Sequence, residues 1–291
     1  MMKKLRFTKM HGISNDYVYI STFDQPEEDW EQLAIRLSDR RTGIGGDGII
    51  LVCPSDVADA KMRIFNADGS EGMMCGNGIR CVGKFVYDKG LVPADKTAIT
   101  IDTLSGVKTL ELTVKDGKVQ SARVDMGAAI LNPADIPAEF DGDRMIDAPL
   151  EVDGRVWKVT AVSMGNPHCV IFVDDVDGLE LEKIGPHFER HPAFPERVNT
   201  EFVKVIDDHT LQMRVWERGS GETWACGTGA CATAVAACLN GYCKKGEDIT
   251  VRLRGGELVI RYTDETVIMT GPAATVFEGE AEINEELGIR N

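Results

Sequence analysis

Two cysteines stand in the same sequence context, and that context allows a thiol to do acid–base chemistry. Cys75 opens the run Cys-Gly-Asn-Gly and Cys226 opens the run Cys-Gly-Thr-Gly, each ahead of a predicted helix. A helix N-terminus leaves backbone N–H groups unpaired and carries positive partial charge. A thiol placed there is expected to lose its proton more easily than a free cysteine, whose pKa is roughly 8.5. The glycines let a carboxylate or phosphate approach the backbone closely.

The two cysteines lie in a duplicated unit of sequence. The 151 positions that separate Cys75 from Cys226 also separate other matching residues. The matches are residues 62–65 with 213–216, Glu71 with Glu222, Gly90 with Gly241, and Asn15 with Asn166. Such a repeat predicts two similar halves, each with one cysteine at the start of one helix. Halves that face each other would place two sulfurs around one bound anion, where one takes a proton from a carbon and the other returns one.

A purely structural role is the alternative interpretation of these cysteines. Small buried cysteines are common in protein cores, and a single Cys-Gly-x-Gly run would favour that role. Here the motif occurs twice and its polar neighbours match as well. We therefore favour the chemical interpretation.

Length and composition bound the class of protein. The chain has 291 residues, of which 43% are hydrophobic, which is enough for two globular domains. A net charge of −15 argues against nucleic acid as a partner. No apolar run is long enough to span a membrane, and the N-terminal residues lack the apolar stretch of a signal peptide. We expect a cytoplasmic protein that acts on a small molecule.

The eight cysteines and five histidines do not suggest disulfides or a metal site. The length and the expected reducing compartment favour thiols. The cysteines lack paired zinc spacing and the histidines lack an HExxH or HxH pattern. The sequence therefore predicts no bound metal.

Four helices are predicted among many strands. Residues 29–38 have apolar side chains at helical spacing, with Asp29 as the cap. Further helices are predicted at residues 76–88, 179–187 and 230–239, the last buried on all sides because its residues are small or apolar. Residues 132–154 are rich in Pro, Asp and Gly, which is typical of a linker. Alternating patterns predict strands elsewhere, and the strand at residues 274–283 is expected to return to the first half.

This order of elements predicts an α+β fold. We expect two pseudosymmetric domains, each a strand-rich sheet or barrel wrapped around a central helix. The N-terminal domain should comprise residues 1–126 plus 274–291, and the C-terminal domain residues 127–273.

Six separated motifs resemble those of the diaminopimelate epimerase family, in the family's order and over nearly the full length. They are KMHGISNDYV, RRTGIGGDG, FNADGSEGMMCGNGIRC, SMGNPHCV, PERVN and WERGSGETWACGTGACA. The resemblance implies two domains around a cleft and epimerisation of LL-2,6-diaminoheptanedioate to the meso form. It implies no pyridoxal phosphate and no metal, a role in lysine and peptidoglycan precursor biosynthesis, and a homodimer.

The resemblance also implies roles for individual residues. Cys75 and Cys226 would be the base and the acid, one thiolate and one thiol, exchanging roles with the direction of reaction. Backbone N–H groups for the carboxylate at the reacting carbon would come from Gly76, Asn77, Gly227 and Thr228. The distal end would be held by Asn15, Asn66, Asn166, Asn199, Glu217 for its ammonium and Arg218 for its carboxylate. His168 would support the site. One departure is Gly48, where some members have glutamine, so the contact from that loop differs here.

The residue types suit this chemistry on physical grounds, although each also has a simpler interpretation. Abstracting an α-proton builds carbanion charge beside a carboxylate, and fixed N–H donors stabilise it. A planar guanidinium suits a second carboxylate. In the simpler interpretations, Glu217 and Arg218 form a surface ion pair, the asparagines form turns, and His11 and His168 pack or cap.

Three other functions fit parts of the pattern. A racemase of proline or hydroxyproline could use the same cysteine pair, but Glu217, Arg218 and the four asparagines would then have no distal group to bind. A thiol redox protein would join Cys75 and Cys226 in a reversible disulfide. A binding module for dicarboxylates would need neither thiol as an acid or base.

Overall fold

The computed structural model describes residues 2–25 and 27–284. It divides into two compact units: Met1–Arg123 with Pro272–Asn291, and Val124–Gly271. We call these the N-terminal unit and the C-terminal unit. The chain passes from one to the other within strand β8 (Lys118–Asp125) and returns within strand β17 (Val267–Pro272).

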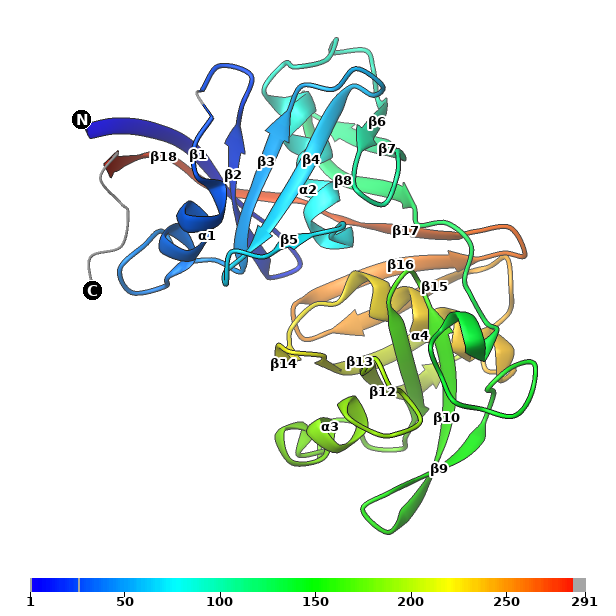
Figure 1. Cartoon of the computed structure of the whole chain (residues 1–291). Helices are drawn as coiled ribbons and strands as arrows, with labels where there is room; N and C mark the ends of the chain where they lie inside the picture. The colour runs from blue at the N-terminus through cyan, green and yellow to red at the C-terminus, as the bar shows by residue number, and fades with distance from the viewer. Residues whose placement is uncertain (1, 26, 285–291) are drawn as a thin grey trace. The chain divides into compact units, whose positions relative to one another are not determined.

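The N-terminal unit is a sheet wrapped around one helix. Its other strands are β1 (Met2–Gly12), β2 (Asn15–Ser21), β3 (Gly48–Cys53), β4 (Ala60–Asn66), β5 (Glu71–Gly72), β6 (Ala98–Asp102), β7 (Lys108–Lys115) and β18 (Ala274–Asn284). β18 pairs with β1, as its pattern predicts. Strands β1 to β4, β6 and β7 all contact helix α2 (Gly76–Asp88), while helix α1 (Trp30–Ser38) packs on β2, β3 and β4 (Figure 1).

Alternation along the strands separates the two faces of this sheet. Val18 and Ile49 point into a core that Trp30 of α1 completes. The neighbouring residues point the other way, so the Tyr19 hydroxyl donates to the carbonyl of Gly78 in α2 at 3.3 Å. α1 begins after Asp29, whose carboxylate accepts from the backbone of the first turn, as predicted.

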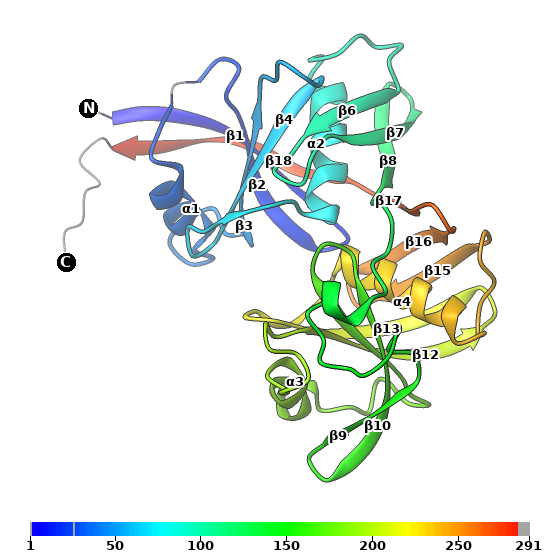
Figure 2. The ribbon, with the colours of Figure 1, turned by 45° about the vertical axis from the view of Figure 1, so that its right-hand side comes forward.

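The C-terminal unit repeats this arrangement. Its strands are β9 (Ala148–Val152), β10 (Arg155–Ser163), β11 (Pro167–Phe172), β12 (Asn199–Asp207), β13 (Thr210–Glu217), β14 (Gly221–Thr223), β15 (Asp248–Leu253) and β16 (Gly256–Tyr262), with a 3-10 turn η1 at Pro133–Asp135. Helix α4 (Gly227–Leu239) contacts β10 to β13, β15 and β16, and helix α3 (Leu181–Glu189) contacts β12 to β14 (Figure 2).

The sequence repeat is a structural repeat. Adding 151 to the bounds of α1 and α2 gives the bounds of α3 and α4. The register is kept as well, because Ile49 pairs with Phe65 and Thr200 pairs with Trp216. α4 begins three residues before the predicted start at Ala230, and no helix within the described ranges has the length and apolarity to cross a membrane.

The segment 132–154 is not a linker, and that prediction is wrong. Ile136, Met145 and Leu150 are buried in the core beneath α3. β9 lies in this segment and pairs antiparallel with β10. The segment is rich in Pro, Asp and Gly, but the few apolar residues between them are buried and form part of the C-terminal core.

One ion pair occurs at the same place in both units but with different burial. Arg63 Nε donates to Glu71 Oε1 at 2.8 Å, and Arg214 Nε donates to Glu222 Oε1 at 2.8 Å. The first pair is about 30% exposed, whereas Arg214 is 7% exposed and also donates to the carbonyls of residues 176, 177 and 179. Removing Arg214 would leave three carbonyls without this donor, and it would leave the buried Glu222 with the guanidinium of Arg254, whose Nη1 lies 2.9 Å from Glu222 Oε1.

We therefore predict that Arg214→Leu lowers the free energy of unfolding by about 3 kcal/mol, the range for breaking a buried pair. The matched variant Arg63→Leu should cost about 1 kcal/mol or less, because its partner keeps access to solvent. Urea titration followed by circular dichroism measures both. Equal losses of unfolding free energy in the two variants would contradict the interpretation that burial makes the second ion pair more important.

Candidate active site

Cys75 caps helix α2 with its sulfur. The backbone N–H of Gly78 donates to Cys75 Sγ at 3.3 Å. The thiol in turn donates to Asn15 Oδ1 at 3.3 Å, and Asn15 Nδ2 donates to Asp47 Oδ2 at 2.7 Å. Two predicted site residues, Asn15 and Cys75, therefore meet, and the predicted position of the cysteine at a helix start is confirmed.

A buried guanidinium lies beneath the first turn of α2. Arg80 is fully buried and donates to the carbonyl of Gly76 at 3.1 Å and to Asn77 Oδ1 at 3.0 Å. It also donates to the carbonyl of Pro272 at 3.2 Å. The Asn77 side chain is thus held from inside the helix, while the N–H groups of the first turn have no acceptor within the helix itself. Positive charge lies close behind the helix end that carries Cys75.

Cys226 caps helix α4 in the same way. The N–H of Gly229 donates to Cys226 Sγ at 3.3 Å, and the Thr228 hydroxyl lies 3.6 Å from the sulfur. The residue is 5% exposed, whereas Cys75 is half-buried. Both helix starts therefore present a sulfur beside glycine-flanked backbone, but the second thiol is more enclosed.

Carboxylates surround the second thiol. Burial, then the charges of Glu217 and Glu201, raises the pKa of the Cys226 thiol well above its ordinary value. Burial also raises the pKa of Glu217, although hydrogen bonds from the Thr223 hydroxyl and the Cys226 thiol act in the opposite direction. The expectation that a helix start makes Cys226 a stronger acid is wrong in this structure, because desolvation and two negative neighbours outweigh the helix end.

His168 lies between two polar side chains in the C-terminal unit. Its Nδ1 is 2.7 Å from Glu201 Oε1 and its Nε2 is 3.1 Å from Asn166 Oδ1. His168 and Glu201 are both fully buried. The ring therefore lies between the predicted substrate ligand Asn166 and a carboxylate.

The remaining predicted ligands lie at strand ends. Asn199 Oδ1 accepts the backbone N–H of Arg218 at 2.8 Å, and the Arg218 guanidinium donates to the carbonyl of Glu196 at 3.1 Å. Asn66 Nδ2 donates to Ser70 Oγ at 3.0 Å within the turn after β4. Arg218 and Glu217 each have partners other than one another, so the simple surface ion pair does not describe them.

Sequence reasoning missed three polar residues of these clusters: Asp47, Arg80 and Glu201. Asp47 lies in a glycine-rich loop, and Arg80 lies in a helix whose other residues are mixed in type, so neither residue type nor spacing distinguishes them. Glu201 did carry a signal, because the repeat places it on Ile50 and thus puts an acid at a buried apolar position.

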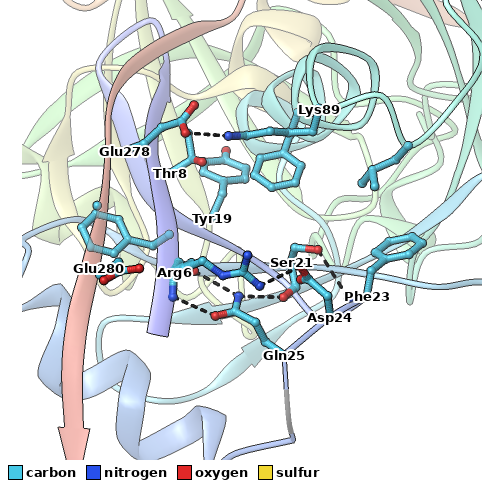
Figure 3. Close-up of a pocket in the computed structure, with 14 residues that line it drawn as sticks. Arg6, Thr8, Tyr19, Ser21, Phe23, Asp24, Gln25, Lys89, Glu278 and Glu280 are labelled. Carbon is cyan, nitrogen blue, oxygen red and sulfur yellow. Dashed lines mark hydrogen bonds and ion pairs between the residues drawn. The ribbon is translucent and has the colours of Figure 1, made fainter. Parts of the chain in front are cut away.

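A separate groove lies on the N-terminal unit, and none of the predicted site residues lines it. It has a volume of about 690 Å³, and Figure 3 shows its polar side chains turned toward one another. Arg6 pairs with Asp24 at 2.7 Å and Lys89 pairs with Glu278 at 2.7 Å. These charged side chains already pair with one another, so we place the candidate active site at the two cysteine clusters and not in this groove.

Comparison with known proteins identifies the family. The family model for diaminopimelate epimerase matches residues 7–132 and 160–276. A diaminopimelate epimerase of Acetivibrio thermocellus is 55% identical over 283 residues, which cover 97% of this chain and 100% of that protein. The chain belongs to the diaminopimelate epimerase family. Another member, from Methanococcus maripaludis, is 52% identical and covers 96% of this chain and 100% of its own length. The predicted family, and with it the class of amino-acid epimerases, is confirmed.

Solved structures of more distant proteins share the fold. A phenazine biosynthesis protein of the PhzF family from Bacillus anthracis has a TM-score of 0.72 at 16% identity, covering 97% of this chain and 100% of that one. A hydroxyproline epimerase from Agrobacterium vitis has a TM-score of 0.71 at 15% identity, covering 98% and 94%. The predicted α+β fold of two pseudosymmetric domains, each a sheet around a central helix, is confirmed.

We predict that iodoacetamide at pH 8 alkylates Cys75 at least about tenfold faster than Cys226. The thiolate is the reactive form, and the raised pKa of Cys226 keeps it protonated until the pH rises well above the ordinary value. Burial of Cys226 acts in the same direction. Peptide mapping by mass spectrometry after short exposures measures both rates.

Labelling in urea provides the control, because both cysteines should then react alike. Glu217→Gln should speed alkylation of Cys226 and leave Cys75 unchanged. Faster labelling of Cys226 in the native protein would contradict the electrostatic difference between the two helix starts.

Proposed function

We propose that this protein epimerises one stereocentre of LL-2,6-diaminoheptanedioate to give the meso form, with two cysteines as acid and base. The proposal rests mainly on one observation: equivalent helices of the two units are each capped by a cysteine sulfur, with N–H donors of Gly78 and Gly229 at 3.3 Å. Membership of the family supports the substrate. The reaction would use neither pyridoxal phosphate nor a metal, and it would serve lysine and peptidoglycan precursor biosynthesis.

The proposed reaction needs one thiolate and one thiol, which share a single proton between them. A thiolate takes the α-proton from one face of the carbon, and the thiol on the opposite face gives its proton to the carbanion. The thiolate and thiol have then exchanged places, so the return reaction uses the same groups reversed. Backbone N–H groups of Gly76, Asn77, Gly227 and Thr228 would hold the adjacent carboxylate as charge develops, a contribution typically of about 10² to 10³ in rate for each donor.

We propose that Cys226 rests as the thiol and that Cys75 becomes the thiolate by giving up the proton that it donates to Asn15 Oδ1. The Cys226 sulfur is buried with Glu217 and Glu201 near it, and its pKa is raised. Behind the helix start of Cys75 lies the buried Arg80 instead. Cys75 would then be the base in the first half of a cycle that begins from the resting state.

The distal end of the substrate would meet the polar residues of both clusters. Glu217 would bind the distal ammonium. The positive charge would offset the effect of burial, which raises the pKa of this carboxyl. Arg218 would bind the distal carboxylate. Further hydrogen bonds would come from Asn15, Asn66, Asn166 and Asn199, with His168 in support. Enclosing the reacting carbon would also keep water from the carbanion.

We also propose that the protein is a cytoplasmic homodimer. Val276 and Phe277 of β18 are 55% and 46% exposed although both are large and apolar. Large contiguous apolar patches mark surfaces that a partner covers, and these two side chains would contribute to such a patch. The described part of β18 therefore offers a candidate surface for a second copy.

Exchange of the α-hydrogen with solvent tests the function. In deuterium oxide with a reducing agent and no added cofactor, LL-diaminopimelate should gain deuterium at one α-carbon as the meso isomer forms. Proton NMR and chiral chromatography measure both. Retention of the hydrogen after long incubation would contradict the proposal, and exchange into proline instead would support a proline racemase.

Cysteine variants separate the two-base chemistry from mere binding. Cys75→Ala and Cys226→Ala should each lower racemisation at least about 10³-fold, because each removes one proton carrier. Cys238→Ala, at the far end of α4, is the matched control and should retain activity. Near-normal turnover in either of the first two variants would exclude the two-cysteine mechanism.

A further inference from the structure

A buried carboxylate lies behind His168 in the C-terminal unit. Glu201 is on β12, where Thr200 and Phe202 point toward α3 and Glu201 points toward α4. It is fully buried, with Oε1 at 2.7 Å from His168 Nδ1. Within residues 2–25 and 27–284 its second oxygen, Oε2, meets no hydrogen-bond donor. Burying a carboxylate with only part of its hydrogen bonding is costly, so the fold retains it at the expense of stability.

The repeat shows that the fold does not need an acid at this position. Ile50 occupies the equivalent place in the N-terminal unit and is also fully buried. A Cβ added at Gly78 would lie 2.6 Å from Ile50 Cδ1, and one added at Gly229 would lie 2.7 Å from Glu201 Oε1. The two side chains therefore fill the same space against the first turn of equivalent helices. An apolar residue satisfies the packing, so the carboxylate has another use.

His168, the hydrogen-bonding partner of Glu201, is also replaced in the N-terminal unit. The repeat places Tyr17 on His168, so the acid and the imidazole occur together in the C-terminal unit and are both replaced in the other. An ionised Glu201 only accepts, so His168 donates to it from Nδ1. In the neutral ring His168 Nε2 can then only accept, so Asn166 bonds to it by turning its Nδ2 toward the ring in place of Oδ1, which lies 3.1 Å away. The bond to Glu201 keeps the ring from turning.

We propose that Glu201 is a positioning residue for the reaction: it holds the Nδ1–H of His168, and the fixed ring sets the amide of Asn166 to bind the distal end of the substrate. This inference rests on the proposed function. Glu201 touches no substrate atom in this scheme. It acts on substrate binding through His168, while its charge also acts on the pKa of Cys226. Because the distal end is bound equally in the ground and transition states, loss of the bond to His168 should weaken substrate binding.

Steady-state kinetics of two variants test this role. Glu201→Ile places the residue of the N-terminal unit in the equivalent space, and Glu201→Gln keeps the shape and one acceptor. We expect KM for LL-diaminopimelate to rise about tenfold in Glu201→Ile and less in Glu201→Gln. Both variants remove the charge that raises the pKa of Cys226, so any change in kcat should be the same in the two. Ile50→Val, which alters the same space in the other unit, is the control and should leave both constants unchanged.

A second readout does not depend on catalysis. In the substrate-free protein, ¹⁵N NMR of the His168 ring should show a protonated Nδ1 in the wild type and in Glu201→Gln, and a mixture of tautomers in Glu201→Ile. His168→Gln identifies the signal. An unchanged KM and an unchanged Nδ1 signal in folded Glu201→Ile would overturn the inference, as would a loss confined to kcat. Wild-type protein without α-hydrogen exchange would instead overturn the proposed function, and the NMR result would still report on Glu201 and His168.

Discussion

The hydrogen bond from a glycine N–H to a cysteine sulfur, made once in each unit, is the constraint on which the rest of the structure depends. Both bonds measure 3.3 Å and both cap the start of a buried helix. A side chain at Gly78 or Gly229 would collide with the strand behind it. Only glycine lets the helix start approach the sheet so closely, and this approach fixes the sulfur where the helix carries its positive end.

Around this shared constraint the two units differ in their polar residues. Where the N-terminal unit has Ile50 beside its helix start, the C-terminal unit has the buried acid Glu201. Where the former has Arg80 just after the first turn of its helix, the latter has Cys231. The backbone is duplicated, but the electrostatics are opposed: a cation behind Cys75 and carboxylates around Cys226. Under the proposed chemistry this difference gives two thiols of the same geometry distinct resting states.

The sequence predicted the backbone of the site well and its electrostatics poorly. The bounds of α2 and the sulfur at each helix start follow from local signals, namely glycine spacing and the repeat. Segment 132–154 was misread because its turn-forming residues outnumber the few apolar ones that fill the core. The raised pKa of Cys226 could not be predicted, because it depends on burial and on Glu201, which lies 25 positions away in sequence and meets the helix only in the fold.

The central claim is that the two thiols act on a single carbon, and mild oxidation tests it most directly. A disulfide forms only when two Cα atoms come within about 7 Å. Treatment with oxidised glutathione, followed by mapping under non-reducing conditions, should yield one peptide that joins Cys75 to Cys226. Activity should fall as this peptide forms and return with dithiothreitol. Full oxidation that leaves these two cysteines unlinked, or links either one to a different cysteine, would contradict the account.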